Sequence, residues 1–140
     1  PAFPLEQTVA NLNTDMIGRI DKRYINNPNY VYLIGSDRIS TELDYIVRNA
    51  NDEFTNLELD YTYNALNDSN RYYSRSDHYN FALKDIPVIF FFNGEHHDYH
   101  KASDTVDKIN FEVLKKRTQL IFATAWYIAN ADNPPIKEVL

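Results

Sequence analysis

Three of the four histidines of the chain lie between His96 and His100, directly after an apolar run that ends at Phe92. Neutral imidazole is a good zinc ligand, and a nearby carboxylate can fix its tautomer and ring orientation. The spacing of His100 and Asp104 would allow such a pairing. The other interpretation of this cluster is a solvated polar loop on an acidic protein, because short motifs of this kind have low specificity.

Two further segments carry side chains that could take part in chemistry. Asp15 ends an apolar segment, and a carboxylate is rarely buried without a partner. Its other interpretation is a cap for the turn that follows. Ser76, Asp77 and His78 open a segment of helical pattern. Ser76 or Asp77 could be the N-cap of that helix, and a capping residue can also be a functional one.

The apolar pattern predicts the elements that would position these residues. We expect strands at residues 7–17, 30–35, 57–63 and 87–92, and helices from Ser36 or Asp37 to about 49, at 76–84 and at 111–130. This alternation favours an α/β fold with helices on the faces of a mostly parallel sheet. In such sheets functional residues collect where strands end, and the segments around Asp15 and from Gly94 to Thr105 both follow strands.

Composition excludes several classes of protein. The net charge is −6 and no basic run is present, which argues against nucleic-acid binding. No apolar stretch approaches the ~20 residues that a membrane span requires. The chain has no cysteine, so disulfides and thiolate metal sites are excluded, and only three glycines, so a glycine-rich phosphate loop is excluded. The length of 140 residues is typical of one domain.

The ordered set of motifs resembles the C-terminal half of the catalytic domain of peptidase family M28, the zinc aminopeptidases and carboxypeptidases. The motifs are Asn13-x-Asp15-Met16-Ile17-Gly18-Arg19, Ser76-Asp77-His78-x-x-Phe81, Asp85-Ile86-Pro87, and Gly94-x-His96-x-Asp98-Tyr99-His100 with Asp104 and Thr105. The resemblance covers about residues 3 to 130. It implies an incomplete three-layer α/β sandwich of the phosphorylase/hydrolase-like zinc peptidase fold, with about four strands and about three helices. Residues 1–140 would be the C-terminal portion of a single zinc-peptidase domain.

The resemblance also implies roles for individual residues. Asp15 and His100 match zinc ligands of the family, one for each of its two zinc ions, and Tyr99 would stabilise the tetrahedral intermediate. Positions around the ligands or in the substrate region are implied for Asp104, Ser76, Asp77 and His78.

One part of the family pattern is absent. The family has a Glu-Glu pair that supplies the general base and one ligand, and no such pair exists in this chain. A His-x-Asp spacing occurs at His96 and Asp98, but in a different motif from the family's. Zinc sites use three or four protein ligands, so we expect weak or no zinc binding and no activity from this chain alone. The parent protein would be a hydrolase acting on peptides, a metalloprotease of the aminopeptidase kind.

Three interpretations follow. In the first, the chain is an incomplete zinc aminopeptidase domain that lacks an N-terminal half, and its exposed sheet surface leads it to self-associate. In the second, it is a binding or interaction module that keeps the peptidase fold without the chemistry. In the third, it is an unrelated α/β protein with a local metal site formed by His96, His97, Asp98 and His100. Resemblance to bacterial members implies a periplasmic or extracellular location.

Overall fold

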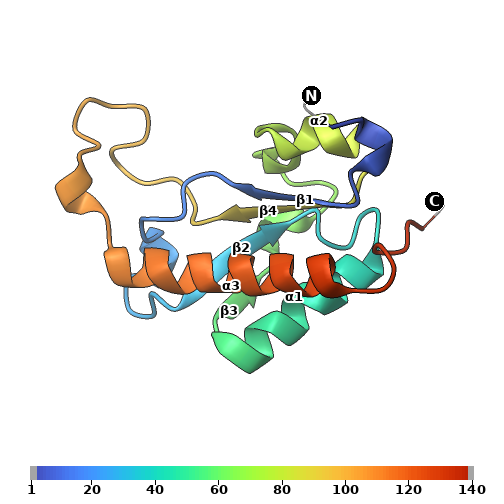
Figure 1. Cartoon of the computed structure of the whole chain (residues 1–140). Helices are drawn as coiled ribbons and strands as arrows, with labels where there is room; N and C mark the ends of the chain where they lie inside the picture. The colour runs from blue at the N-terminus through green and yellow to red at the C-terminus, as the bar shows by residue number, and fades with distance from the viewer. Residues whose placement is uncertain (1–2, 139–140) are drawn as a thin grey trace.

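Four strands form one open sheet in the order β1–β4–β2–β3 (Figure 1). The computed structural model describes residues 3–138. The strands are β1 (Asn11–Thr14), β2 (Tyr30–Ile34), β3 (Glu58–Asp60) and β4 (Val88–Phe92). β1 pairs with β4 and β2 with β3 in parallel, whereas β2 and β4 are antiparallel. The prediction of an α/β fold with a mostly parallel four-stranded sheet is confirmed.

Helices cover both faces of this sheet. The long helices α1 (Thr41–Phe54) and α3 (Phe111–Asn130) pack on one face, and the short α2 (His78–Ala82) lies on the other. Short 3-10 helices lie at Leu5–Gln7, Lys22–Tyr24, Thr62–Asn64, Tyr72–Ser74 and Val106–Lys108. The bounds of α3 and the central position of β4 agree with the sequence prediction. Every residue of β2 and β4 is buried, as expected for apolar strands inside a sheet.

The two sheet faces have different cores. The face under α1 and α3 is mainly aliphatic, and its buried residues include Val31, Leu33, Leu43, Ile89 and Leu120 together with the aromatic Phe91. The opposite face is aromatic, with Tyr24, Tyr30, Tyr32, Tyr72, Phe90 and Phe92. Successive side chains of a strand point to opposite faces, so β2 and β4 each contribute to both cores.

The strand predicted at residues 7–17 is shorter than its apolar pattern indicates. β1 pairs with β4 only from Asn11 to Thr14, and Met16 adopts a left-handed conformation with φ of 60°. The strand predicted at 57–63 is reduced to β3. The Asp60 carboxylate accepts a hydrogen bond from the Thr62 amide at 2.7 Å, a local turn that competes with strand pairing.

The predicted start of the first helix was wrong. α1 begins at Thr41, and its N-cap is Ser40, whose hydroxyl accepts a hydrogen bond from the Leu43 amide at 3.2 Å. Ser36 instead donates to the Asp44 carboxylate inside α1. Capping depends on the backbone angles of the residue as well as its type, and sequence pattern does not give those angles.

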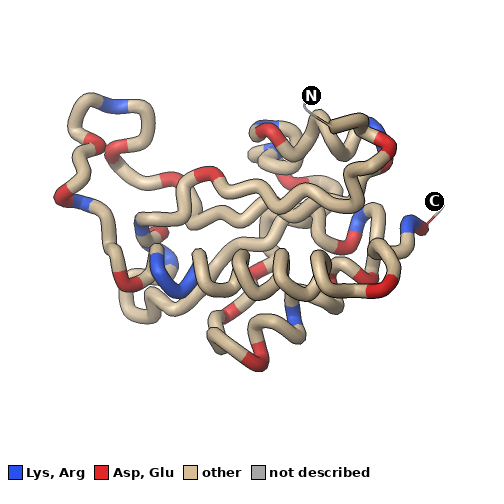
Figure 2. Tube along the Cα trace, viewed as in Figure 1, with Lys and Arg blue, Asp and Glu red and all other residues tan. Residues whose placement is uncertain are grey.

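The charged residues are mixed along the chain. Figure 2 shows Lys and Arg scattered along the trace with Asp and Glu between them. No helix within residues 3–138 has the length and apolar character needed to cross a membrane.

Candidate functional site

The ends of β1 and β4 meet at one edge of the sheet because these two strands are parallel. The Asn93 amide donates to the Met16 carbonyl at 2.9 Å, and the Asp15 amide donates to the Phe91 carbonyl at 3.4 Å. The structure therefore brings together the two polar segments that the sequence placed after strands.

Ser76 contacts Asp15 directly. Its hydroxyl donates to the Asp15 carboxylate at 2.9 Å and accepts from the Asn13 side-chain amide at 2.9 Å. Ser76 therefore orients the exposed Asp15 carboxylate. Asp77 occupies the N-cap position of α2, as predicted for Ser76 or Asp77, but its side chain makes no capping hydrogen bond. Asp77 is exposed beside this contact.

His78 lies beneath this group and is fully buried. Its ring stacks on Phe90 with centroids 4.7 Å apart, and its Nδ1 lies 3.5 Å from the amide nitrogen of Asn13. Burial lowers the pKa of His78 to about 4, so the ring is neutral at pH 7. His78 supports Asn13 from inside the protein and does not extend into solvent.

A small cavity of about 20 Å³ joins Asp15 to Tyr99. Its volume is about that of one water molecule. It is lined by Asp15, Met16, Tyr72, Arg75, Phe90, Phe92, Glu95 and Tyr99. The Tyr99 ring stacks on the His100 ring with centroids 3.9 Å apart. His100 is exposed and left-handed, with φ of 56°. Tyr99 thus lies between the Asp15 cavity and His100.

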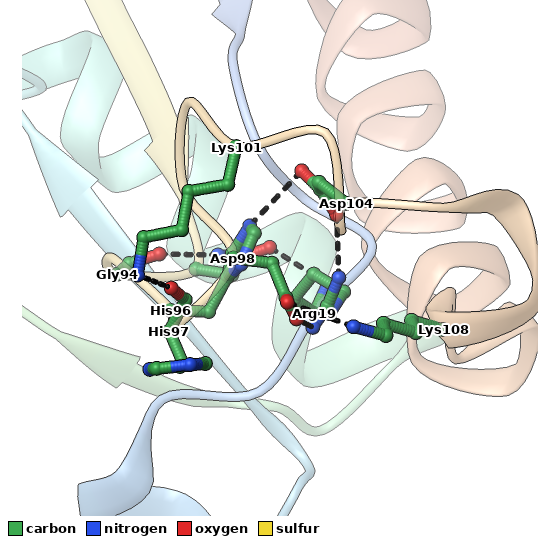
Figure 3. A network of polar contacts seen from close by, with 9 residues as sticks. Arg19, Gly94, His96, His97, Asp98, Lys101, Asp104 and Lys108 are labelled. Carbon is green, nitrogen blue, oxygen red and sulfur yellow. Dashed lines mark hydrogen bonds and ion pairs between the residues drawn. The ribbon is translucent and has the colours of Figure 1, made fainter.

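Asp98 is the centre of an ion-pair network that the sequence analysis missed (Figure 3). Its carboxylate accepts from Arg19 Nη2 at 2.7 Å and from Lys108 Nζ at 2.7 Å. These contacts hold the pKa of Asp98 well below its usual range. Asp104 pairs with Arg19 at 2.5 Å and lies 3.6 Å from His96 Nε2. The pairing proposed for Asp104 from spacing alone was with His100; the described contacts of Asp104 are with Arg19 and His96.

Arg117 of α3 is a second residue that the sequence analysis missed. It is fully buried, and its guanidinium donates to the backbone carbonyls of Tyr30, Ile17 and Arg19 at 2.9, 2.7 and 2.7 Å. Desolvation by burial lowers the pKa of Arg117. A signal was present in the sequence, because Arg117 falls on the same helical face as the buried Val113 and Leu120.

The donor set of Asp15 and His100 fits zinc in kind, because carboxylate and imidazole are both zinc ligands. It is incomplete in number. Within residues 3–138 no group of three or more His, Asp, Glu or Cys side chains could hold a metal ion. A zinc site built on Asp15 or His100 therefore needs further ligands, since such sites use three or four.

Comparison with known proteins gives a family match and a structural match. The family model described as Peptidase family M28 matches residues 1–125. A search of curated proteins finds no match. The crystal structure of Legionella pneumophila LapA aminopeptidase superposes with a TM-score of 0.68 at 21% sequence identity. This likeness concerns the fold. It covers 89% of this chain and 32% of the LapA chain, so the chain spans about a third of the length of that aminopeptidase.

Proposed function

This chain belongs to peptidase family M28, and we propose that it contributes Asp15 and His100 to a two-zinc peptidase centre. The remaining ligands would lie outside these 140 residues, which in this proposal are the C-terminal portion of one zinc-peptidase domain. One observation carries the proposal: Asp15, at the end of the edge strand β1, lines the same small cavity as Tyr99, whose ring stacks on His100.

Each residue of the chain has a distinct task in this proposal. Ser76 orients the Asp15 carboxylate through its hydroxyl. Tyr99 lines the cavity beside Asp15, so its hydroxyl is the candidate donor to the oxyanion of the intermediate. Bound zinc would supply polarisation of water and of the substrate carbonyl. The general base, a Glu of the family's Glu-Glu pair, would come from outside this chain.

We further propose an aminopeptidase as the parent protein, exported to the periplasm or the cell exterior, with this chain inactive by itself. With zinc added, we expect no hydrolysis of leucine p-nitroanilide above the rate of the metal alone. The physical reason is the ligand count, because one ligand for each metal ion gives weak binding. Turnover that requires both the chain and zinc would contradict this expectation.

A second candidate function is a binding module that keeps the peptidase fold without its chemistry. The lack of a three-ligand group within residues 3–138 fits this candidate as well as the first one. The two candidates differ in how the chain should interact with a metal ion, so a metal titration separates them.

The test is a Co²⁺ titration of the chain followed by NMR, because paramagnetic Co²⁺ broadens nearby resonances even when binding is weak. The zinc-peptidase proposal predicts broadening around Asp15 and His100, with the effect reduced in Asp15→Asn and unchanged in His97→Gln. Absence of broadening at both residues would favour the binding module. Broadening centred on His96 and His97, and lost in His97→Gln, would instead indicate a local site in the loop.

The free edge of β1 is the surface where we propose that the remaining part of the domain pairs. β1 is an edge strand, Ala10 and Leu12 are only partly buried, and the side-chain oxygen of Asn11 is buried without a described partner. An unpaired edge also favours pairing with a second copy. We therefore expect dimers or larger species in size-exclusion chromatography with light scattering, and a strictly monomeric profile would count against this surface.

A further inference from the structure

The loop between β4 and α3 has little apolar support. Figure 1 shows this segment extending away from the sheet, and residues 101–108 are all exposed. Loops of this kind open locally at low free-energy cost unless specific contacts hold them. The loop carries Tyr99 and His100, so its position decides where these two side chains lie relative to Asp15.

Ion pairs provide the specific contacts. The Asp98 side chain is 7% exposed and lies between Arg19 and Lys108, each at 2.7 Å. Arg19 also reaches Asp104 at the far end of the loop, at 2.5 Å. A single guanidinium therefore joins two carboxylates of the loop, and the Lys108 ammonium closes the group (Figure 3). Charge-assisted hydrogen bonds of this type are stronger than neutral ones.

Arg19 is itself fixed to the core at its backbone. Its amide donates to the Asn93 side-chain oxygen at 2.8 Å, and its carbonyl accepts from the buried Arg117 at 2.7 Å. Arg19 follows Asp15 by only four residues in the sequence. The same short segment thus contains a candidate metal ligand and the residue that contacts the opposite loop.

The conformation of the loop also needs support. Residues 98–101 form a turn in which the Lys101 amide donates to the Asp98 carbonyl at 2.9 Å, and the Tyr99 amide donates to the His96 carbonyl at 3.0 Å. His100 is left-handed in this turn, with φ of 56°. Non-glycine residues persist in that region where their surroundings fix them.

We propose that Arg19, Asp98 and Lys108 form a positioning clamp that sets the place of Tyr99 and His100 relative to Asp15. A role of this placement in catalysis rests on the proposed function. The existence of the clamp does not depend on that function. None of its three members needs to contact metal or substrate. They act through the loop, so they are positioning residues for the residues proposed to do the chemistry.

The experiment measures the loop directly, on the whole chain, without metal or substrate. Amide hydrogen exchange followed by NMR reports the turn through the Tyr99 and Lys101 amides. Met16 is the only methionine and lines the cavity with Tyr99, so a labelled Met16 methyl gives one resonance that reports the Tyr99 ring. In Arg19→Gln we expect the turn amides to exchange at least about tenfold faster, while β4 amides keep their wild-type rates. The nuclear Overhauser contact between Met16 and Tyr99 should weaken.

Three further variants complete the design. Arg19→Lys keeps a charge that can reach one carboxylate and should restore part of the protection. Lys108→Gln changes a side chain that is 38% exposed, so the fold should tolerate it, and should loosen the turn less than Arg19→Gln does. Arg48→Gln removes the ion pair between the exposed Arg48 and the buried Asp44 on α1 and should leave the loop unchanged.

Two results would overturn the clamp. One is wild-type exchange and an unchanged Met16–Tyr99 contact in Arg19→Gln. The other is equal acceleration in the loop and in β4, which would make Arg19 a general support of the fold. If Arg19→Gln does not fold, Lys108→Gln decides by the same criteria. Because no metal is added, a failure of the Co²⁺ titration leaves this result standing, and the reverse also holds.

Discussion

Asp15 and His100 lie in surroundings of opposite kinds. Asp15 follows a sheet strand, and its carboxylate is held by the neutral hydroxyl of Ser76, with the buried His78 behind Asn13. His100 lies on an exposed loop whose described fixed points are ion pairs, chiefly those of Asp98. One side of the candidate site is therefore held by packing and by hydrogen bonds from uncharged donors, and the other by ion pairs.

This difference has a consequence for how the two sides respond to conditions. Salt screens pairs of exposed or partly exposed charges, whereas buried neutral contacts are affected much less. Low pH, by contrast, destabilises the Asp15 side. The folded protein keeps the buried His78 neutral, whereas the unfolded chain gains a proton on this histidine at low pH. Salt, pH and mutations should therefore change the stability of the two sides of the candidate site separately, except where both sides depend on the same residue.

Arg117 is the residue on which both sides depend. It donates to the carbonyls of Ile17 and Arg19, on the segment that joins Asp15 to the clamp, and to the carbonyl of Tyr30. Arg117→Met leaves three carbonyls without their donor, and we expect a loss of about 3 kcal/mol or more in unfolding free energy. Urea unfolding measures this loss.

The control for that variant is Lys115→Met, which changes an exposed charge on the same helix. It should alter stability by no more than about 0.5 kcal/mol. If Arg117→Met were as stable as the wild type, the desolvation cost of the buried guanidinium would cancel its hydrogen bonds, and Arg117 would not join the two sides.

The pH dependence of His78 tests the Asp15 side alone. Burial lowers its pKa from 6.5 to about 4, so the unfolded chain binds a proton between these values and the folded chain does not. The neutral folded state is therefore fully stable above pH 6.5 and loses stability as the pH falls toward 4. By linkage we expect His78 to account for a loss of about 2–3 kcal/mol over this range.

The comparison variant is His78→Phe, which keeps a ring against Phe90 but does not titrate. Urea unfolding at pH 7.5 and at pH 4.5 should show a larger loss for the wild type than for His78→Phe. Equal losses in both proteins would mean that His78 titrates normally in the folded state and is not held neutral by burial.

Much of the fold could be predicted from local pattern. The helix 111–130 follows from apolar residues at helical spacing, and the central strand β4 follows from a continuous apolar run. Burial of these apolar side chains stabilises both elements. The placement of Asp15 beside the histidine loop follows from parallel pairing of β1 and β4. These features depend on residues that are near each other in sequence or on the general geometry of sheets.

The features that could not be predicted from the sequence depend on tertiary contacts or on backbone angles. Arg19 and Asp98 are 79 residues apart, and no local pattern links them. The sequence pattern predicted Ser76 as a possible helix cap, but its hydrogen-bond partner Asp15 is 61 residues away. β1 ends early where Met16 is left-handed, although its apolar pattern continues to Ile17. Local sequence pattern therefore predicts the helices and strands, whereas the long-range polar contacts that position the site are seen only in the structure.

A smaller change on the Asp15 side is Ser76→Ala. It removes the hydroxyl that joins Asp15 to Asn13, and we expect a loss of about 1 kcal/mol in unfolding free energy. The loss should be similar at low salt and in 1 M NaCl, because no ion pair is broken. Ser69→Ala, at an exposed loop position, is the matched control and should have little effect. A loss that disappears in salt would show that charge also holds this side.

The smallest expected effect lies on the loop side, in Asp104→Asn. Asp104 has a side chain 39% exposed, and Arg19 keeps its contact with Asp98 when Asp104 is neutral. Exposed ion pairs contribute little, so we expect a loss of about 0.2–1 kcal/mol at low salt that vanishes in 1 M NaCl. Asp107→Asn, which neutralises an exposed carboxylate of the same loop, controls for net charge. Salt should erase the difference for Asp104 and preserve it for Ser76, because charge holds one side of the site and neutral contacts hold the other. If both differences survived in salt, the Arg19–Asp104 pair would owe its strength to hydrogen-bond geometry instead of charge.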